Sequence, residues 1–180
     1  MVKRGHKVTV LTRGGEDDPE HEVIQGMDIY RYRFSVSAAG YPFSVIRAVR
    51  RMRKIAGAGG FDLVNMHHAS GGVAAEISKK LSGRVPTAFF FQGPWHGEAM
   101  AKEGRSVSGG RLPLKYVVRR KVDRFILRHC DAVFCLSDYM YGEASAISPS
   151  LAAKYHKLSG GVDIERFHPA QDERAVRSEL

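Results

Sequence analysis

The fold is decided by one stretch of the sequence, Pro86-Thr87-Ala88-Phe89-Phe90-Phe91-Gln92-Gly93-Pro94-Trp95-His96-Gly97-Glu98. Its first six residues form a short apolar run, which is typical of a strand buried on both faces of a parallel sheet. The run ends in a polar loop whose glycines permit close approach of the backbone. Because ligands of open α/β sheets bind at the carboxyl ends of the strands, the loop of residues 92–98 is predicted to face a binding cleft.

Similar apolar runs alternate with helical stretches along the rest of the chain, which indicates βαβ units and a mostly parallel sheet. Besides 86–91, strands are predicted at residues 7–12, 27–34, 63–67, 132–136 and 155–158. Amphipathic helices are predicted at residues 43–56, 73–81 and 112–129. The predicted fold class is therefore α/β, with a doubly wound, Rossmann-like sheet.

Length and composition support one domain and limit its partners. The chain has 180 residues and a net charge of +9, which suits a single core and favours anionic partners. No apolar run approaches the roughly 18 residues of a membrane helix, so we expect a soluble, cytoplasmic protein. The helices at 43–56 and 112–129 are basic and could also bring it into peripheral contact with the inner face of an anionic membrane. Cys130 and Cys135 lack C-x-x-C spacing and are expected to be reduced core thiols.

The 92–98 loop carries groups that suit a carbohydrate. Gln92, His96 and Glu98 offer an amide, an imidazole and a carboxylate to sugar hydroxyls, and Trp95 offers an apolar wall. Gly93 lets a ligand approach the backbone. The structural alternative is a turn that leads into a helix, with Trp95 in the core.

Two other strand ends carry candidate binding residues. His67 and His68 follow the strand at 63–67 and are predicted to contact substrate, although neighbouring strand residues point to opposite faces and a metal site is not expected. Gly71 and Gly72 come next and either leave free N–H groups for an anion or serve ordinary packing. Ser137 ends the strand at 132–136, where it either caps the next helix or contacts ligand.

The end of the sequence reads Ser159-Gly160-Gly161-Val162-Asp163-Ile164-Glu165-Arg166-Phe167-His168-Pro169. It resembles the G-V-D-x-x-x-F-x-P linker of family 4 glycosyltransferases. Residues 2–12, 92–98 and 131–137 are similar to three further motifs of that family, L-x-x-x-G-H-x-V-x-V-x-T, H-G-P-W-x-x-E and A-D-x-V-I-x-x-S. Two positions depart from the family pattern: Gln92 replaces a histidine and cannot act as a base near neutral pH, and Gly160 replaces an asparagine.

The resemblance implies that residues 1–169 are the acceptor-side, N-terminal Rossmann-like domain of a GT-B enzyme. Residues 170–180 would begin the connection to a C-terminal domain, with Gly161, Val162, Asp163 and Arg166 organising the junction. The first strand and most of the first helix of this fold would precede residue 1. Their loss would leave an apolar seam between the strands at 7–12 and 63–67, so we expect self-association.

The activity implied by the resemblance is retaining transfer of a sugar from a nucleotide-sugar donor to an acceptor hydroxyl, without metal or other cofactor. The acceptor would be a carbohydrate or a lipid-linked molecule. The family holds the donor mainly through its C-terminal domain, so this chain alone is expected to be inactive, and no residue can be named as catalytic. The alternatives are a GT-B relative such as a sugar-nucleotide epimerase, or a basic α/β module that binds anionic membrane or nucleic acid. Nucleic acid is not expected, because RNP and helix-turn-helix patterns are missing.

Overall fold

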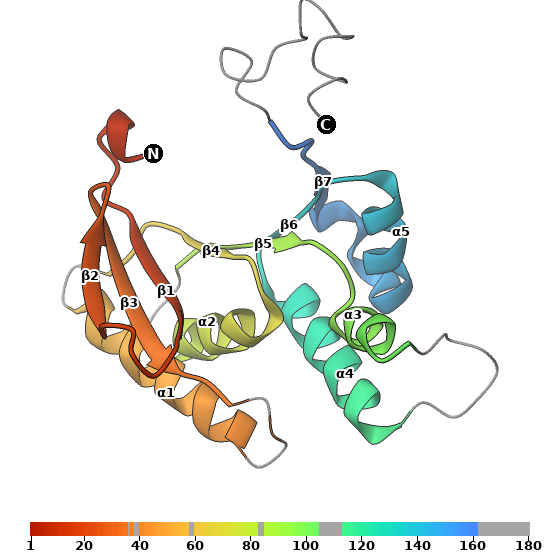
Figure 1. Ribbon diagram of the computed structural model, residues 1–180. Helices are drawn as coiled ribbons and strands as arrows, with labels where there is room; N and C mark the ends of the chain where they lie inside the picture. Colours follow the sequence, from red (N-terminus) through yellow and green to blue (C-terminus); the bar gives the residue numbers. More distant parts are fainter. Residues whose placement is uncertain (36, 38–39, 58–59, 83–84, 105–112, 162–180) are drawn as a thin grey trace, which may run out of the picture.

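A computed structural model describes residues 1–35, 37, 40–57, 60–82, 85–104 and 113–161 (Figure 1). Of the predicted junction residues, Gly161 is the last one described, and Val162, Asp163 and Arg166 lie outside these ranges. No helix in the described ranges is long and apolar enough to cross a membrane.

The first sheet is built from strands β1 (Thr9–Gly14), β2 (His21–Ile24) and β3 (Met27–Arg33), in the order β1-β3-β2. β1 and β3 are parallel, and β2 pairs antiparallel with β3. The hairpin between β2 and β3 turns at Gln25 and Gly26, whose φ angles of 51° and 79° are those of a type I′ turn. β1 and β3 were predicted, whereas β2 is an additional strand.

The second sheet contains four parallel strands in sequence order: β4 (Val64–Met66), β5 (Thr87–Phe91), β6 (Ala132–Cys135) and β7 (Tyr155–Lys157). All four were predicted, each one or two residues longer than the structure shows. In the described part of the chain, β1 and β4 are edge strands that do not pair with each other. The seam expected from the sequence would lie between these two edges.

Five α-helices connect the strands in the described ranges: α1 (Gly40–Ala56), α2 (Ala69–Ser82), α3 (Trp95–Lys102), α4 (Leu114–His129) and α5 (Asp138–Ile147). Short 3₁₀ turns lie at Val2–Arg4 and Pro149–Lys154. α1 packs against both β3 and α2, so the helical layer runs under both sheets (Figure 1). The architecture is α/β and Rossmann-like, as predicted.

The main core lies between the four-stranded sheet and helices α2, α4 and α5. Phe89, Phe91 and Val133 point from the sheet into this core, where they meet Ile126 and Leu127 of α4. Gly72 allows the close contact between α2 and α4, since a Cβ atom there would lie 2.9 Å from Cδ1 of Ile126. Gly72 is thus explained by packing, the structural alternative stated above.

Both cysteines belong to the same core. Cys130 and Cys135 are free thiols and fully buried, which confirms the prediction of reduced core thiols.

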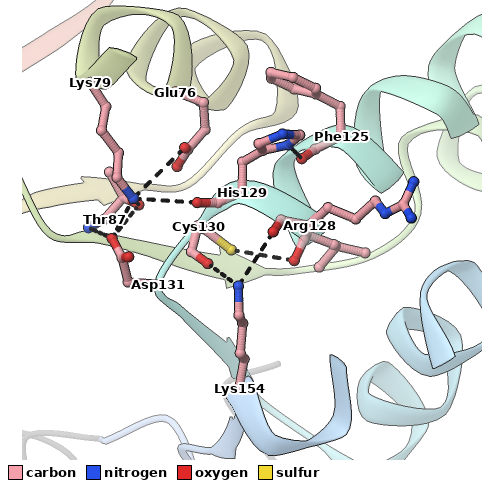
Figure 2. Close-up of polar contacts among 10 residues, drawn as sticks. Glu76, Lys79, Thr87, Phe125, Arg128, His129, Cys130, Asp131 and Lys154 are labelled. Atoms are coloured by element: carbon pink, nitrogen blue, oxygen red, sulfur yellow. Dashed lines mark hydrogen bonds and ion pairs between the residues drawn. The ribbon is translucent and has the colours of Figure 1, made fainter. Parts of the chain in front are cut away.

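Polar side chains lock the amino end of the four-stranded sheet (Figure 2). Nζ of Lys79 in α2 donates to Oδ2 of Asp131 at 2.5 Å and to the carbonyl of His129 at 3.3 Å. Asp131 also accepts from the backbone N–H of Thr87 at 2.8 Å. On the other side, Lys154 donates to the carbonyls of Arg128 and Cys130 at the end of α4. These contacts tie α2, α4 and β5 together.

Candidate functional site

The carboxyl ends of β3, β4 and β5 meet around the indole ring of Trp95. Trp95 opens α3, directly after the loop that follows β5. Its ring lies 5.5 Å from the ring of Tyr41 at the start of α1 and 6.1 Å from the ring of His68 after β4. The guanidinium of Arg119 in α4 lies over the ring at 5.2 Å. Trp95 is half-buried against the main core, so it combines the structural role with an accessible surface beside the predicted cleft.

A chain of aromatic rings extends from Trp95 toward the first sheet. Tyr41 contacts Phe34 at 6.0 Å between ring centroids, and the guanidinium of Arg13 lies 5.2 Å from the Phe34 ring. The hydroxyl of Tyr41 is buried and has no hydrogen-bond partner among the described residues. Burial, together with the charges of Tyr32 and Asp123, raises the pKa of Tyr41 to about 12. A buried hydroxyl without a partner is costly, and a ligand or water hydroxyl at this point would satisfy it.

Asp123 of α4 supports the loop from beneath. Its side chain is buried, and Oδ2 accepts a hydrogen bond from the backbone N–H of Trp95 at 2.9 Å. The carboxyl group therefore caps the N-terminus of α3, where a free N–H and the helix dipole favour an acceptor. Burial raises the pKa of Asp123 to about 7. The hydrogen bond from Trp95 acts against this shift, and the charge of Glu98 acts with it.

Sequence reasoning missed Asp123. The sequence does show that Asp123 lies at helical spacing from apolar residues. It is seven residues after Tyr116, three before Ile126 and four before Leu127, so it is a carboxylate on the buried stripe of α4. An acidic residue on such a stripe needs a partner, and that partner is a backbone N–H 28 residues earlier in the chain.

His96 lies beside this carboxyl group. Its Nδ1 is buried, 3.9 Å from Oδ2 of Asp123, and has no hydrogen-bond partner in the described part of the chain. Burial lowers the pKa of His96, with Arg120 acting in the same direction and Glu143 against it. The ring is therefore a neutral hydrogen-bonding group near pH 7.

The two adjacent histidines point to different sides of the sheet, as predicted. His68 lies near Trp95, where its Nδ1 accepts from the backbone N–H of Ser70 at 3.2 Å and contacts the Ser70 hydroxyl at 2.9 Å. His68 is exposed, yet partial burial of its ring lowers its pKa. The charges of Arg13 and Lys102 lower this pKa further, and the charge of Glu98 raises it. His67 stacks on Phe90 instead, 5.0 Å between centroids.

The remaining predicted residues divide between the loop and a helix cap. Gln92 and Glu98 are exposed, and Gly93 has a φ of 153°, with its Cβ position 3.6 Å from Oε1 of Glu98. Ser137 accepts a hydrogen bond from the backbone N–H of Met140 and so caps α5, the structural alternative stated above. The structure thus brings Trp95 together with His68 and, through Asp123, with His96, whereas His67 packs on Phe90. No group of three or more His, Cys, Asp or Glu side chains able to hold a metal ion occurs within the described ranges.

Solved structures with the same fold include those of a synthase and of an epimerase. The chain superimposes on sucrose-phosphate synthase from Thermosynechococcus elongatus with a TM-score of 0.69 at 15% identity, over 98% of this chain and 44% of that chain. A second, shorter structure of this synthase matches with a TM-score of 0.61 at 13% identity, over 92% of this chain and 82% of that one. UDP-N-acetylglucosamine 2-epimerase from Rickettsia bellii matches with a TM-score of 0.51 at 13% identity, over 97% and 52%. At such identities the likeness shows the fold.

The family is shown by the sequence itself. Comparison with curated proteins finds no significant match. The chain spans less than half of the first synthase chain. The sequence model described as Glycosyltransferase Family 4, however, matches residues 1–166, nearly the whole chain. The chain therefore belongs to glycosyltransferase family 4.

Proposed function

We propose that this chain is the acceptor-binding part of a retaining glycosyltransferase that moves a sugar from a nucleotide-sugar donor to an acceptor hydroxyl. The observation that carries the proposal is the family match over residues 1–166. It is supported by the cluster of aromatic and neutral imidazole groups at the carboxyl ends of β4 and β5, the usual ligand position in an open α/β sheet.

The side chains of the cluster suit a sugar in complementary ways. The ring of Trp95 is a flat apolar surface for the C–H groups of a pyranose. His68 uses Nδ1 as an acceptor for Ser70 N–H, so its neutral ring carries the proton on Nε2 and can donate to a hydroxyl. Gln92 and Glu98 lie exposed at the rim, where they can add polar contacts.

None of these groups is proposed as the catalytic base. Gln92 has no basic form, and no contact among the described residues marks His68 or His96 as a base. In the proposed reaction the chain binds and orients the acceptor. A donor-binding domain of the kind found in the family would supply most contacts to the nucleotide-sugar, and no metal ion or other cofactor takes part.

The proposed location is the cytoplasm, with peripheral contact at the inner face of an anionic membrane if the acceptor is lipid-linked. The exposed cations of α1 favour such contact.

Acceptor binding can be tested on the 180-residue chain. We expect saturation-transfer NMR to detect binding of at least one of the methyl glycosides of glucose, mannose, galactose and N-acetylglucosamine. His68→Ala is expected to weaken that binding about five- to tenfold, the usual effect of losing one hydrogen bond to a ligand. His6→Ala, which changes an exposed histidine near the N-terminus, is the matched control and should have no effect. Equal effects of both variants, or no binding of any glycoside, would contradict the acceptor role.

Transfer is tested separately, with UDP-glucose, UDP-N-acetylglucosamine and GDP-mannose as donors. We expect this chain alone to release no nucleoside diphosphate and form no glycoside. Sugar transfer by the chain alone would contradict the proposal that a separate domain is needed to bind the donor. Epimerised nucleotide-sugar as the product would favour the epimerase class instead.

A further inference from the structure

We propose that a basic hollow between β1, β3 and α1 is a binding site for a phosphate group. The hollow has a volume of about 450 Å³ and lies at the carboxyl ends of β1 and β3. Six cationic side chains line it: Arg31, Arg33, Arg47, Arg50, Arg51 and Lys54. Three carboxylates also line it, so positive charge dominates.

Two of the six cations hold the structure together. Arg31 forms an ion pair with Glu22 and donates to the carbonyl of Pro19 at 3.1 Å. Arg51 donates to the carbonyl and to Oε2 of Glu20, at 3.0 and 2.9 Å. These contacts connect the loop before β2 to β3 and to α1, so they form one wall of the hollow. Nε of Arg51 is buried without a hydrogen-bond partner among the described residues, so even this engaged guanidinium keeps one donor unsatisfied.

The other four cations have no such partner. Arg33, Arg47, Arg50 and Lys54 are exposed, and their side chains form no ion pair or hydrogen bond with any residue that the structure describes. Arg47, Arg50 and Lys54 follow one another at intervals of three and four residues on one side of α1, where like charges destabilise a helix. α1 contains no acidic residue that could relieve this repulsion. An anion in the hollow would relieve it.

An ordinary solvated basic face does not explain this arrangement, as α4 shows. α4 holds six Lys and Arg residues, against five in α1, and three of the six are engaged. Lys115 pairs with Glu103 at 2.7 Å, Arg119 lies over Trp95, and Arg124 donates to the carbonyl of Ile147 at 3.1 Å. Other exposed cations, such as Arg53 and Lys121, lie outside the hollow, whereas the four unpaired cations of β3 and α1 line one concave surface.

Phosphate is the anion that fits this set. Arginine presents a planar fork of donors that matches two phosphate oxygens at once, and three of the four free cations are arginines. A phosphate group carries up to two charges and offers several oxygens, so it can engage cations from both β3 and α1. The site does not depend on acceptor binding near Trp95, and it can be tested whether or not that proposal holds.

The test uses the 180-residue chain with inorganic phosphate, glycerol 3-phosphate and phosphatidylglycerol vesicles as probes, at one fixed ionic strength. Titrations followed by NMR or calorimetry are expected to show saturable binding of at least one probe. The double variant Arg47→Gln/Arg50→Gln should weaken it at least tenfold, since it removes two charge-assisted contacts. The matched control Arg53→Gln/Lys121→Gln removes the same charge at exposed positions outside the hollow and should change binding less than twofold.

The probes also separate the two sources of phosphate. Binding of glycerol 3-phosphate without binding to the vesicles indicates a soluble phosphorylated ligand. Tighter binding to vesicles at equal phosphate concentration, with none to phosphatidylcholine vesicles, indicates a lipid headgroup. Either result supports the site. The proposal is overturned if no probe binds saturably, or if both double variants weaken binding equally, because the effect is then one of net charge.

Discussion

The two faces of the four-stranded sheet differ more than their sequences suggest. One face is covered by α2, α4 and α5, and its side chains Phe89, Phe91 and Val133 are at most 3% exposed. On the other face, four rings form a row that begins directly after β4 and crosses β5, β6 and β7. Their order is His67, Phe90, Phe134, His156, with neighbouring centroids 5.0 to 5.6 Å apart. We call this row the open-face stack. Its two phenylalanines are half-buried and its two histidines are exposed.

The difference shows that residue type alone does not decide burial in this sheet. Phe89 and Phe90 are neighbours in β5, yet alternation along the strand sends them to opposite faces. In Figure 1 the helices that contact this sheet lie on one side of it. Parallel sheets are normally covered on both faces, so the open-face stack keeps apolar surface that the covered face has lost.

The largest expected effect compares these two neighbours directly. Phe89→Ala should destabilise the chain by about 3–5 kcal/mol, since it leaves a cavity in the main core. Phe90→Ala should cost about 1 kcal/mol, since the side chain is half-buried and its site can be filled by solvent. Urea unfolding of both variants measures the difference. Equal costs would mean that the open face is covered in solution.

A second effect concerns the buried acid on the covered side. The pKa of Asp123 is about 7 in the folded chain and about 3.9 in an unfolded one. The folded chain therefore binds this proton more tightly, and the stability from this group is full below pH 4, falls as the pH rises to 7 and stays low above it. Asp123→Asn should remove this slope, so that relative to the parent it gains about 2–4 kcal/mol between pH 4 and pH 8.

Thermal unfolding across that pH range measures the gain. The matched control is Asp138→Asn, which changes an acid with a side chain 83% exposed. Parallel stability curves for the parent and Asp123→Asn would show that the carboxyl group is already ionised at low pH, contrary to expectation.

A third effect tests what the open face does at high concentration. Self-association remains a prediction, and the open-face stack and the edge strands β1 and β4 are the candidate surfaces in the described part of the chain. If the stack drives association, Phe90→Thr/Phe134→Thr should weaken it about tenfold in sedimentation velocity. Phe43→Thr/Tyr139→Thr changes two exposed aromatics elsewhere, 62% and 69% exposed, and should not. Association that survives the first double variant would point to the strand edges.

The smallest expected change in stability concerns Asp131, at the amino end of the four-stranded sheet. Partial burial would raise the pKa of Asp131, but the hydrogen bonds from Lys79 and Thr87 outweigh it and lower the pKa. The resulting stability is present above the usual pKa of about 3.9 and is lost as the pH falls through the lower folded value. Asp131→Asn should cost about 1 kcal/mol at pH 7, because the side chain is half-exposed and solvent screens it. The cost should shrink below pH 4; a cost that is the same at pH 3 and pH 7 would contradict this origin.

Much of the fold could be predicted because it depends on local patterns. The runs around Phe89 and Val133 mark strands by themselves, and the Gly-rich loop after Phe91 indicated the carboxyl-end cluster around Trp95. β2 was not predicted, because its four residues contain only two apolar side chains, Val23 and Ile24. Gly26, which can adopt the positive φ of a tight hairpin turn, was the signal that the sequence offered.

The parts of the site that escaped prediction depend on contacts between distant residues. The role of Asp123 becomes visible only when α4 is placed under the loop that leads into α3. Likewise, Gly72 could be a phosphate-loop or a packing glycine until Ile126 is found against it. Sequence spacing describes one element at a time, whereas these roles arise between elements.

The burial of both cysteines has a practical consequence for experiments on this chain. Burial raises the pKa of Cys130 to about 12 and also raises that of Cys135. A maleimide reagent reacts with the thiolate, so the native thiols are expected to stay unlabelled while the core is closed. A cysteine introduced at the exposed position of Gln92 would then carry a single fluorophore beside Trp95. Slow labelling of the native pair, in the same sample, would report how often the core opens.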